Sequence, residues 1–390
     1  MHPYQHSTTH DTLAHNCRIL KNIDDVVSIR TEWDRLWVDA RAGYLLSFSY
    51  FYESWNTILR PQGAELCCVV SCENGRLLAA LPMVLLRGKV KVWKYAVICS
   101  PEAAEGCDIL IERTTESQAI ATALLKKFLI SARPDLINFF FVKSGSHLEI
   151  AIIQSLASLR IVRAYDNAMP YADLKAEVDW ASYKRSLSKH YESNVARKTR
   201  RLHEQGKVTV DIVRGAPTPA IEWLFLQKRK WSERTNKRGD WVFSSRYQEF
   251  VTKLFASDPR FLVFVLKLDD APIAVKLVAI SSSFASTMMI TYDDKYERFS
   301  PGNVLDEFMM RHIFENYQDS NGRHLDIDFG PGREHFKLHW SRGNVHPTKN
   351  FVMAASRSGL AKLRFDQSRA RIQRLASSFM QAIRSPWGQG

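Results

Sequence analysis

The sequence predicts a mixed α/β fold made of two similar units in tandem. Two apolar segments joined by a turn, a third strand, a helix and a last strand follow one another within residues 66–142, and the same order recurs within residues 261–329. At 390 residues the chain is long enough for two domains that each bury their own core. The repeated order of elements therefore predicts two α/β units with mixed sheets.

The first unit is predicted around a hairpin. Residues 66–70 and 77–86 are apolar runs separated by the turn sequence Glu-Asn-Gly-Arg, and Asn-Gly between apolar runs is the strongest short-range hairpin signal. A helix that carries Trp33 and Trp37 is expected before the hairpin. A strand near residues 90–98, a helix from about 117 to 131 and a strand over 136–142 are expected after it.

A basic helix is predicted between the two units, over residues 180–205, with Gly206 as its C-cap. One face of it, at four-residue steps, carries Tyr183, Leu187, Tyr191 and Val195. Its other faces carry Lys184, Arg185, Lys189, Arg197, Lys198, Arg200 and Arg201. A basic helix face is either simply solvated or binds an anion, and the sequence leaves both readings open.

The second unit is predicted to begin with a strand over residues 208–213 and a helix over 219–234. Strands over residues 261–268, 273–280 and 286–292 follow, and the first two are joined by a turn that begins with Asp269 and Asp270. The unit thus repeats the hairpin and third strand of the first.

The stretch from Thr291 to Trp340 holds the candidates for chemistry. The strand that ends at Tyr292 leads into an acidic, aromatic turn, after which Ser300 and Pro301 suit the N-cap and first position of a helix. The start of a helix carries unpaired N–H groups and partial positive charge, so it can receive a phosphate or a developing oxyanion. We therefore expect an anion site at this helix start.

A short strand over residues 325–329 follows that helix and carries Asp326 and Asp328 on one face, because side chains alternate along a strand. Glu334, His335 and Lys337 follow in a polar loop. Charged groups are therefore expected to gather at one sheet edge, near the helix start.

These segments resemble the second half of the CelD/BcsL-like acetyltransferases, a branch of the GNAT superfamily related to the Fem-type peptidyltransferases. The pattern of that family is a tyrosine-aspartate strand end, an S-P-G helix start and a D-F-G-x-G-x-x-x-Y-K segment. Residues 300–302, residues 328–330, Gly332 and Lys337 match this pattern. Phe336 stands where a tyrosine is usual, so the hydroxyl of that tyrosine is absent here.

The resemblance implies tandem GNAT-like domains, of which the first is degenerate and the second carries the donor site. The expected division is a flexible N-terminus over residues 1–17, a first domain over 18–178, a second domain with the linking helix over 179–355 and a basic amphipathic tail over 356–390. The first domain is expected to be mainly a structural partner that helps to close the acceptor cleft.

The resemblance also implies a donor and site residues. The donor would be an acyl-CoA, with acetyl-CoA as the first choice, and the residues expected to bind it are Arg298, Ser300, Pro301, Gly302 and Asn303. The candidate catalytic residues are Tyr292, Asp293, Asp328, Glu334 and Lys337. One of these carboxylates or His335 would act as base, Tyr292 would return a proton to the departing thiolate, and Lys337 would stabilise negative charge. In the GNAT layout the segment after the first helix covers the acceptor, which makes substrate-contact candidates of Arg234, Lys237, Arg238 and Trp241.

Three functions remain open. The leading hypothesis is an acyl-CoA-dependent N- or O-acyltransferase that acts on a small-molecule, cell-envelope or exopolysaccharide precursor. Classical GNAT enzymes carry a phosphate loop of the form R/Q-x-x-G-x-G/A, whereas residues 298–303 contain one glycine, which keeps a Fem-type transferase that uses aminoacyl-tRNA as the second hypothesis. The absent hydroxyl at Phe336 favours a third, a catalytically silent binding protein.

Composition indicates a cytoplasmic globular protein. Lys and Arg outnumber Asp and Glu by 54 to 41, a formal charge of +13 that attracts anions such as CoA, tRNA or acidic lipid, and no DNA partner is expected. The six cysteines form no C-x-x-C pair, so buried thiols are expected rather than a metal site. The basic tail is expected either to pack on its own domain or to lie at an anionic membrane surface.

Overall fold

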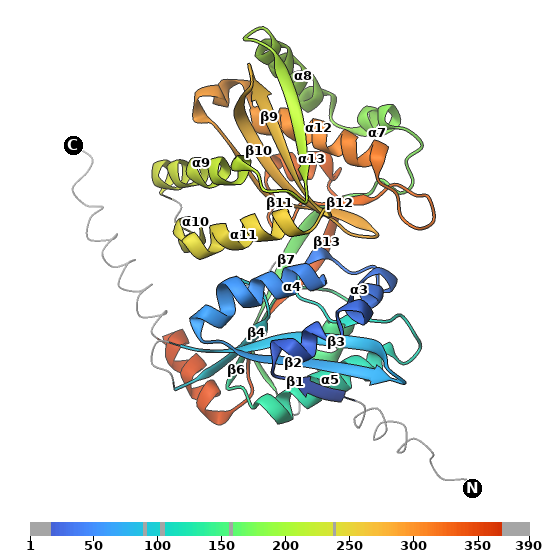
Figure 1. Cartoon of the computed structure of the whole chain (residues 1–390), viewed down its shortest axis with the longest axis vertical. Coiled ribbons are helices and arrows are strands. Elements are labelled where there is room, and N and C mark those ends of the chain that lie inside the picture. The colour runs from blue at the N-terminus through green and yellow to red at the C-terminus, as the bar shows by residue number, and fades with distance from the viewer. Residues whose placement is uncertain (1–16, 89–91, 102–105, 156–158, 237–238, 369–390) are drawn as a thin grey trace, which may run out of the picture.

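The two halves of the chain share one mixed β-sheet. The computed structural model describes residues 17–88, 92–101, 106–155, 159–236 and 239–368. In this part of the chain the strands follow the order β1-β2-β3-β4-β6-β13-β7-β12-β11-β10-β9-β8, and β5 pairs with β3 beside that path. Figure 1 shows the halves stacked along the long axis, with helices over the faces of the sheet. The predicted fold, a mixed α/β architecture, is confirmed.

The first half is formed by the residues before Trp180. Its strands are β1 (Cys17–Leu20), β2 (Glu65–Glu73), β3 (Arg76–Arg87), β4 (Lys94–Ile98), β5 (Leu110–Ile111), β6 (Leu136–Lys143) and β7 (Arg160–Ala172). Its helices are α2 (Ile23–Val27), α3 (Arg30–Asp39), α4 (Phe48–Glu53), α5 (Ser117–Ala132) and α6 (His147–Gln154), with the short turns η1 (Tyr44–Leu46), η2 (Ser54–Leu59) and η3 (Arg60–Gln62).

The second half starts with the two linking helices. Its strands are β8 (Val208–Arg214), β9 (Phe261–Leu268), β10 (Ala271–Ile280), β11 (Phe284–Tyr292), β12 (Asp326–Asp328) and β13 (Val345–Ala354). Its helices are α7 (Trp180–Ser186), α8 (Lys189–His203), α9 (Pro219–Thr235), α10 (Asp240–Phe243), α11 (Ser245–Ser257), η4 (Asp294–Phe299), α12 (Pro301–Asn316) and α13 (His335–Trp340).

Local chemistry explains the two hairpins. Asn74 and Gly75 both have positive φ, 49° and 81°, and they join β2 to β3 in the predicted turn. Asp269 and Asp270 also have positive φ, 49° and 67°, between β9 and β10. Aspartate and asparagine tolerate this left-handed backbone better than most residues that carry a Cβ atom, so both turns form where the sequence places them.

The same strand pairings occur in both halves. The pairs β2–β3 and β3–β4 are antiparallel and β4–β6 is parallel, with α5 in the crossover. In the second half β9–β10 and β10–β11 are antiparallel and β11–β12 is parallel, with α12 in the crossover. The repeated element order of the sequence thus corresponds to a repeated topology.

Two long strands join the halves. β13 lies between β6 and β7 and is antiparallel to both, although it follows the last helix of the second half. β7 continues from the first half to β12, where Tyr171 pairs with Asp328 and Ala172 with Ile327. The expected domain boundary at residues 178/179 therefore follows β7, which pairs with β12 of the second half. The expected second domain, up to residue 355, contains β13, which pairs with β6 of the first half. We call β7 and β13 the exchanged strands.

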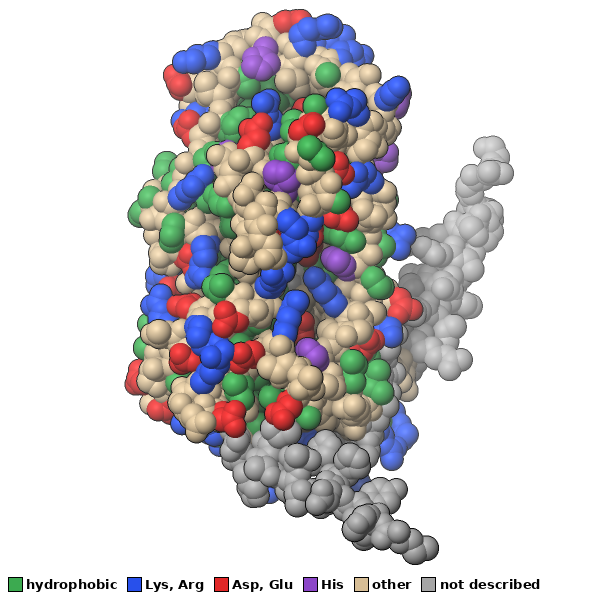
Figure 2. All heavy atoms as spheres, turned by 90° about the vertical axis from the view of Figure 1, so that its right-hand side faces the viewer, with side chains coloured by type: hydrophobic (Ala, Val, Ile, Leu, Met, Phe, Trp, Pro, Cys, Tyr) green, Lys and Arg blue, Asp and Glu red, His purple; other side chains and the backbone are tan. Residues whose placement is uncertain are grey.

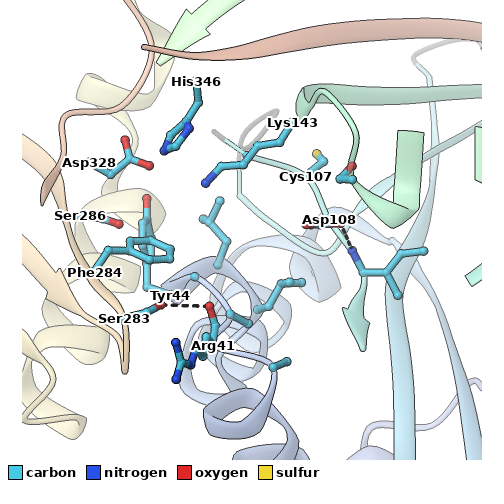
Figure 3. Close-up of a pocket in the computed structure, with 18 of the residues that line it drawn as sticks. Arg41, Tyr44, Cys107, Asp108, Lys143, Ser283, Phe284, Ser286, Asp328 and His346 are labelled. Atoms are coloured by element: carbon cyan, nitrogen blue, oxygen red, sulfur yellow. Dashed lines mark hydrogen bonds between the residues drawn. The ribbon is translucent and has the colours of Figure 1, made fainter. Parts of the chain in front are cut away.

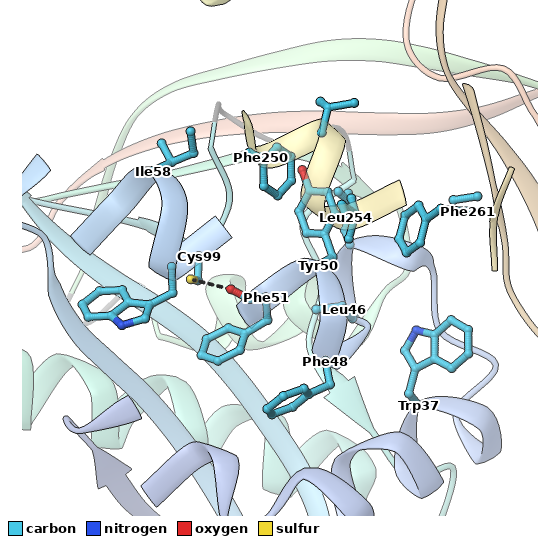
Figure 4. Packing of buried hydrophobic residues seen from close by; sticks show 14 of the residues in the cluster. Trp37, Leu46, Phe48, Tyr50, Phe51, Ile58, Cys99, Phe250, Leu254 and Phe261 are labelled. Atoms are coloured by element: carbon cyan, nitrogen blue, oxygen red, sulfur yellow. Dashed lines mark hydrogen bonds between the residues drawn. The ribbon is translucent and has the colours of Figure 1, made fainter. Parts of the chain in front are cut away.

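An apolar core fills the space between the halves. Helices α3 and α4 of the first half and α9 and α11 of the second contribute to one cluster of buried side chains. Figure 4 shows Tyr50 beside Phe250 within it, and their ring centroids lie 5.4 Å apart. Aromatic packing of this kind buries large areas, so it stabilises one arrangement of the two halves.

The basic linking segment differs from its prediction. Residues 180–205 form two helices, α7 and α8, rather than one, because Leu187 and Ser188 adopt extended backbone conformations with ψ of 165° and 114°. The Leu187 side chain is buried at this break. Leu187 is thus buried as the apolar periodicity predicts, but the extended backbone at residues 187 and 188 interrupts the helix.

Helical structure is also present over residues 357–368, at the start of the predicted tail. The rest of that tail, residues 1–16 of the predicted N-terminus, and the candidates Lys237 and Arg238 lie outside the described residues. In the part of the chain that is described, every helix falls short of the length and apolar character needed to cross a membrane.

Candidate active site

A cavity of about 690 Å³ lies between the two halves. The first half contributes Arg41, Tyr44, Cys107, Asp108, Arg113, Lys143 and His147. The second half and the strands that join the halves contribute Lys175, Phe284, Ser286, Asp326, Asp328, Gly330 and His346. Figure 3 shows Lys143 reaching from the first half toward Asp328 and His346. The cavity therefore has titratable groups on both walls.

Asp328 stands where two parallel strands part. β12 pairs with β11 only from Phe284↔Asp326 to Ser286↔Asp328, and β12 ends there. Asp326 and Asp328 both face the cavity, as their predicted alternation requires, while Ile327 between them is buried in the core beside α12. The carboxyl of Asp328 thus lies at the closed end of the gap between the strands.

The surroundings of Asp328 disfavour its charged form. The residue is 8% exposed, and burial raises the pKa of its carboxyl. Lys143, the Gly330 N–H at 2.8 Å and Lys337 oppose that effect and lower the pKa, but the net direction is upward. A buried carboxyl with a raised pKa at the wall of a cavity is a candidate general base.

The other carboxylate of β12 already has partners. Asp326 accepts a hydrogen bond from the Leu174 N–H at 3.1 Å and forms an ion pair with Lys175. These contacts tie β12 to the segment that follows β7. Asp326 therefore serves the structure of the cavity wall, and Asp328 is the better candidate for proton transfer.

His346 adds a neutral ring to the same wall. Its imidazole stacks on Tyr171 with ring centroids 3.9 Å apart. Burial, followed by the charges of Lys143 and Lys175, lowers the pKa of His346 to about 4. The ring is consequently uncharged near pH 7 and can accept or donate a hydrogen bond in the cavity.

The wall in the first half centres on Asp108 and Lys143. Burial raises the pKa of Asp108, and the Ile109 N–H, Lys143, His147 and Arg113 oppose that effect. Lys143 ends β6, two residues after Phe141, which has a positive φ of 53°. The N–H of Phe141 donates to the Asn350 side chain at 2.7 Å, and this bond holds the unusual backbone in place.

The gap between parallel strands is closed in the first half. β4 and β6 pair only at Tyr95↔Leu136 and Ala96↔Ile137. The Cys107 N–H then donates to the Phe140 carbonyl of β6 at 3.0 Å, and β5 pairs with β3. The chain itself thus fills the space where the strands separate, which leaves no such gap for a ligand in the described part of this half.

The corresponding gap in the second half is open. Beyond Ser286 no strand of the described chain pairs with β11 on the side of β12. On the other side, a register shift opposite Leu277 and Val278 leaves Met288 as an extra residue of β11. From Thr287 to Tyr292 this strand therefore offers backbone groups along an unpaired edge.

The start of α12 lies at the far end of that edge. Tyr292 comes six positions after Ser286, roughly 20 Å of extended strand. Pro301 is the first helical residue as predicted, but Ser300 has φ of 49° and its hydroxyl does not cap the helix. It instead accepts a hydrogen bond from Lys198 of α8 at 2.6 Å. Lys198, one of the basic residues of the predicted linking helix, thus lies beside the predicted anion site.

Some of the residues predicted to bind the donor at that helix start already have contacts within the protein. Arg298 is exposed and its guanidinium lies 4.6 Å from the Phe299 ring centroid. A Cβ atom added at Gly302 would lie 3.5 Å from Cδ1 of Ile290, an ordinary contact. Asn303 donates its N–H to the carbonyl of Ser300 at 3.0 Å. The helix start therefore has Lys198 bonded to Ser300, Arg298 three residues before its first helical residue, and room for a Cβ atom at its glycine.

Tyr292, Asp293 and Arg234 form a polar cluster at the same end. Tyr292 donates to Glu297 at 3.3 Å, and burial, with the nearby Glu297, raises its pKa. Arg234 pairs with Asp294 at 2.8 Å and with Glu297 at 3.3 Å. Asp293 accepts from the Lys295 N–H at 3.0 Å. The structure brings these residues together, but their cluster lies about 20 Å along β11 from Asp328.

Lys337 lies on the short helix α13, and Glu334 is the residue just before that helix. The Lys337 ammonium donates to the Pro331 carbonyl at 2.6 Å and pairs with Glu334 at 3.1 Å. The Lys337 side chain is 12% exposed and that of Glu334 is 56% exposed. The charge of Lys337 reaches Asp328, so these two residues are near each other, while Ser300 lies at the far end of β11.

Phe336 and Trp241 have packing contacts. The Phe336 ring lies 6.0 Å from the ammonium of Lys276, which forms a buried ion pair with Asp306. Trp241 packs against Tyr247 with ring centroids 5.3 Å apart. The substrate contact expected of Trp241 stays a prediction.

Sequence reasoning missed the half of the cavity that precedes residue 180. Lys143 and Asp108 were not candidates because the first unit lacks the acidic and basic constellation of the second. The repeat itself contained a signal, since β6, which ends at Lys143, corresponds in element order to β12, which ends at Asp328. Equivalent strand ends in the two units meet in one cavity.

Comparison with known proteins identifies the domain that carries Asp328. Residues 189–338 match the family model described as an acetyltransferase (GNAT) domain. This segment carries a GNAT acetyltransferase domain. A search among curated proteins finds no match for the chain. The GNAT domain supports an acyltransferase activity.

Solved structures resemble the whole fold. FemX has a TM-score of 0.58 at 11% identity, over 83% of this chain and 95% of FemX. A conserved protein of unknown function from Bacteroides thetaiotaomicron VPI-5482 has a TM-score of 0.50 at 11% identity, over 86% of this chain and 98% of that protein. At such identities the likeness concerns the fold alone, and it extends over both halves.

Proposed function

We propose that the protein transfers an acyl group from acyl-CoA to an amine or hydroxyl of an acceptor that binds in the cavity between the halves. The observation that supports this most is the position of Asp328, a buried carboxyl at the closed end of the open strand gap and on the cavity wall. At this point a donor that lies along β11 would meet an acceptor in the cavity.

The donor would lie along the unpaired edge of β11. Backbone N–H groups between Thr287 and Tyr292 could bind the acyl carbonyl and the amide groups of the donor arm. The start of α12, with Lys198 and Arg298 beside it, would receive the phosphates roughly 20 Å away. An elongated donor with an anionic end, such as acyl-CoA, fits this separation.

Asp328 would take the proton of the attacking group. The nitrogen or oxygen of the acceptor attacks the acyl carbon, its proton passes to Asp328, and the carbon–sulfur bond breaks to release CoA as the thiolate, which then takes up the proton held by Asp328. A base with a raised pKa holds that proton better than an ordinary aspartate. Lys337, whose charge acts on Asp328, would favour the negative charge that develops nearby.

Charge favours an anionic acceptor. Figure 2 shows Lys and Arg side chains gathered around a hollow near the middle of the molecule. Among the described residues, the cationic side chains that line the cavity are Arg41, Arg113, Lys143 and Lys175, against the carboxyl groups of Asp108, Asp326 and Asp328. A precursor of the cell envelope or of an exopolysaccharide that carries a phosphate or carboxylate would suit this lining.

The test combines binding with turnover. Acetyl-CoA and longer acyl-CoAs are titrated in a thermal-shift assay, in which a ligand at one hundred times its dissociation constant adds about 2.7 kcal/mol to the folded state. Transfer to amine and hydroxyl acceptors is then followed by release of free CoA. Asp328→Asn should lower turnover by at least about a hundredfold. Asp211→Asn, which removes one exposed surface carboxylate, serves as the control. Absence of any acyl-CoA binding would reject the proposed donor.

A second function is favoured by the basic helix α8. Lys198 reaches Ser300 at the start of α12, and other basic side chains of α8 lie along the same helix. Such a surface suits the backbone of an aminoacyl-tRNA, the donor expected of a Fem-type transferase. Charged tRNA in the same thermal-shift panel separates the two, because only one donor class should stabilise the protein at low concentration.

A further inference from the structure

One side chain crosses from the first half into the site of the second. Lys143 ends β6, and its ammonium lies 5.4 Å from the ring centroid of Phe284, the first residue of β11. Phe284 pairs with Asp326 and is two residues from Ser286, the partner of Asp328. Figure 3 shows the Lys143 nitrogen on the side of the cavity that holds Asp328 and His346. The first half thus places a positive charge at the closed end of the strand gap.

The charged groups around Asp328 come from several elements. β6 supplies Lys143 and α13 supplies Lys337, and both favour the ionised form of Asp328. β13 supplies His346, which is neutral near pH 7. Tyr171 of β7 is paired opposite Asp328, and on β12 the charge of Asp326 is matched by Lys175. Among the residues that the structure describes, Lys143 and Lys337 therefore remain to act on the charge of Asp328.

These two lysines differ in what else they contact. Lys337 donates to the Pro331 carbonyl and pairs with Glu334, so part of its charge is already compensated. For Lys143, the described residues include no carboxylate within ion-pair distance; its ammonium lies near the Phe284 ring, and its charge also acts on Asp108 of the same half. Lys143 also precedes Lys337 among the groups that lower the pKa of Asp328. Its ammonium is therefore the stronger electrostatic partner.

We propose that Lys143 is a positioning residue for acyl transfer: the first half contributes its ammonium to keep Asp328 ionised in the cavity, ready to accept the proton of the attacking group. The active site is then composite, and the first half has an electrostatic role in addition to shaping the cleft. This inference rests on the role of Asp328 in the proposed function, but the coupling between the two side chains can be measured without turnover.

The experiment measures the titration of Asp328 directly. Full-length protein with aspartate labelled by carbon-13 at the carboxyl carbon is titrated by NMR, and the Asp328 signal is assigned by its absence from Asp328→Asn. In Lys143→Met the midpoint should move to higher pH by about one unit, since loss of a nearby opposite charge favours the protonated carboxyl. Lys143→Arg, which keeps the charge, should stay near the wild-type midpoint. Lys126→Met, an exposed lysine on α5, should leave it unchanged.

The same variants are then compared by the pH dependence of kcat/KM. The base is active when ionised, so activity falls as the pH drops through its midpoint, and Lys143→Met should move this acidic limb upward while Lys143→Arg restores it. An unchanged Asp328 midpoint in a folded Lys143→Met protein would overturn the inference. So would a rise in acceptor KM without a shift of the limb, because that result assigns Lys143 to binding of an acceptor anion. If the wild type transfers no acyl group, the proposed function fails and the NMR titration still decides the coupling.

Discussion

At the scale of single residues, Asp328 links activity to stability. A carboxyl whose folded pKa is raised above its unfolded value stabilises the fold only while it is protonated, and this contribution is lost as the pH rises through the folded pKa. Asp328→Asn removes the cost of a buried charge and keeps an oxygen that can accept from the Gly330 N–H. We expect the variant to have a higher Tm than wild type at pH 8 and a smaller gain at pH 4, measured by calorimetry. A lower Tm at pH 8 would show that Asp328 is stabilised in its charged form.

For Lys337 we expect a large effect on activity and a small effect on stability. Its ammonium is nearly buried and close enough to Asp328 to influence it, so Lys337→Met should lower turnover by at least about a hundredfold, comparable to the loss of one oxyanion donor. Its ion pair with the exposed Glu334 contributes under about 1 kcal/mol, so the melting temperature should change little. Glu334→Gln, which removes the other partner of that pair, separates loss of the pair from loss of the ammonium. Retained activity in Lys337→Met would reduce this lysine to a structural contact.

At the scale of elements, the start of α12 is the proposed binding site of the donor phosphates. Gly302→Val places a side chain against Ile290 and Tyr292, where a single Cβ atom already makes ordinary contacts. We expect donor affinity to fall by at least about tenfold, while the fold is kept, because the backbone can no longer approach a pyrophosphate closely. Calorimetric titration with acyl-CoA measures the change, with Gly302→Ala, whose single Cβ atom would make only ordinary contacts, as the control. Unchanged donor affinity would place the phosphate site elsewhere.

The buried ion pair between β10 and α12 holds the same helix on the sheet. Lys276 and Asp306 are each 2% exposed. Lys276→Met should cost about 3–5 kcal/mol of unfolding free energy, because it leaves the carboxylate of Asp306 buried without its partner. The double variant Lys276→Met with Asp306→Leu should recover most of that loss in urea denaturation. If the double variant is no more stable than the single one, packing rather than charge makes this contact important.

At the scale of the whole molecule, β13 should control the folding of both halves. It pairs with β6 along one edge and with β7 along the other, and β7 in turn pairs with β12. A chain that ends at residue 343 lacks β13 and should lose the cooperative thermal transition seen by circular dichroism. A synthetic peptide of residues 344–356 added in excess should restore that transition. A truncated chain with an unchanged transition would mean that the halves fold without the exchanged strand.

The sequence by itself determined most of the secondary structure and half of the site. Local chemistry at Asn74, Gly75 and Pro301 fixed turns and a helix start, and alternation placed Asp326 and Asp328 on one face. These features depend on neighbours along the chain, which is why periodicity and turn residues predict them. The repeated order of elements likewise predicted the repeated topology, because each unit must bury the same faces.

Only the tertiary structure decided which residues meet. The exchange of β7 and β13 brings the end of β6 to the end of β12, so Lys143 and Asp328 share a cavity although 185 positions separate them in the sequence (328 − 143). It also places Ser300 and Asp328, which are close in sequence, at opposite ends of β11. Such distances depend on strand pairing between distant segments, and the extended backbone at Leu187 likewise interrupts a helix that the local pattern continues. The sequence therefore specified the groups that can carry out the chemistry, and packing of the two halves selected those that face each other.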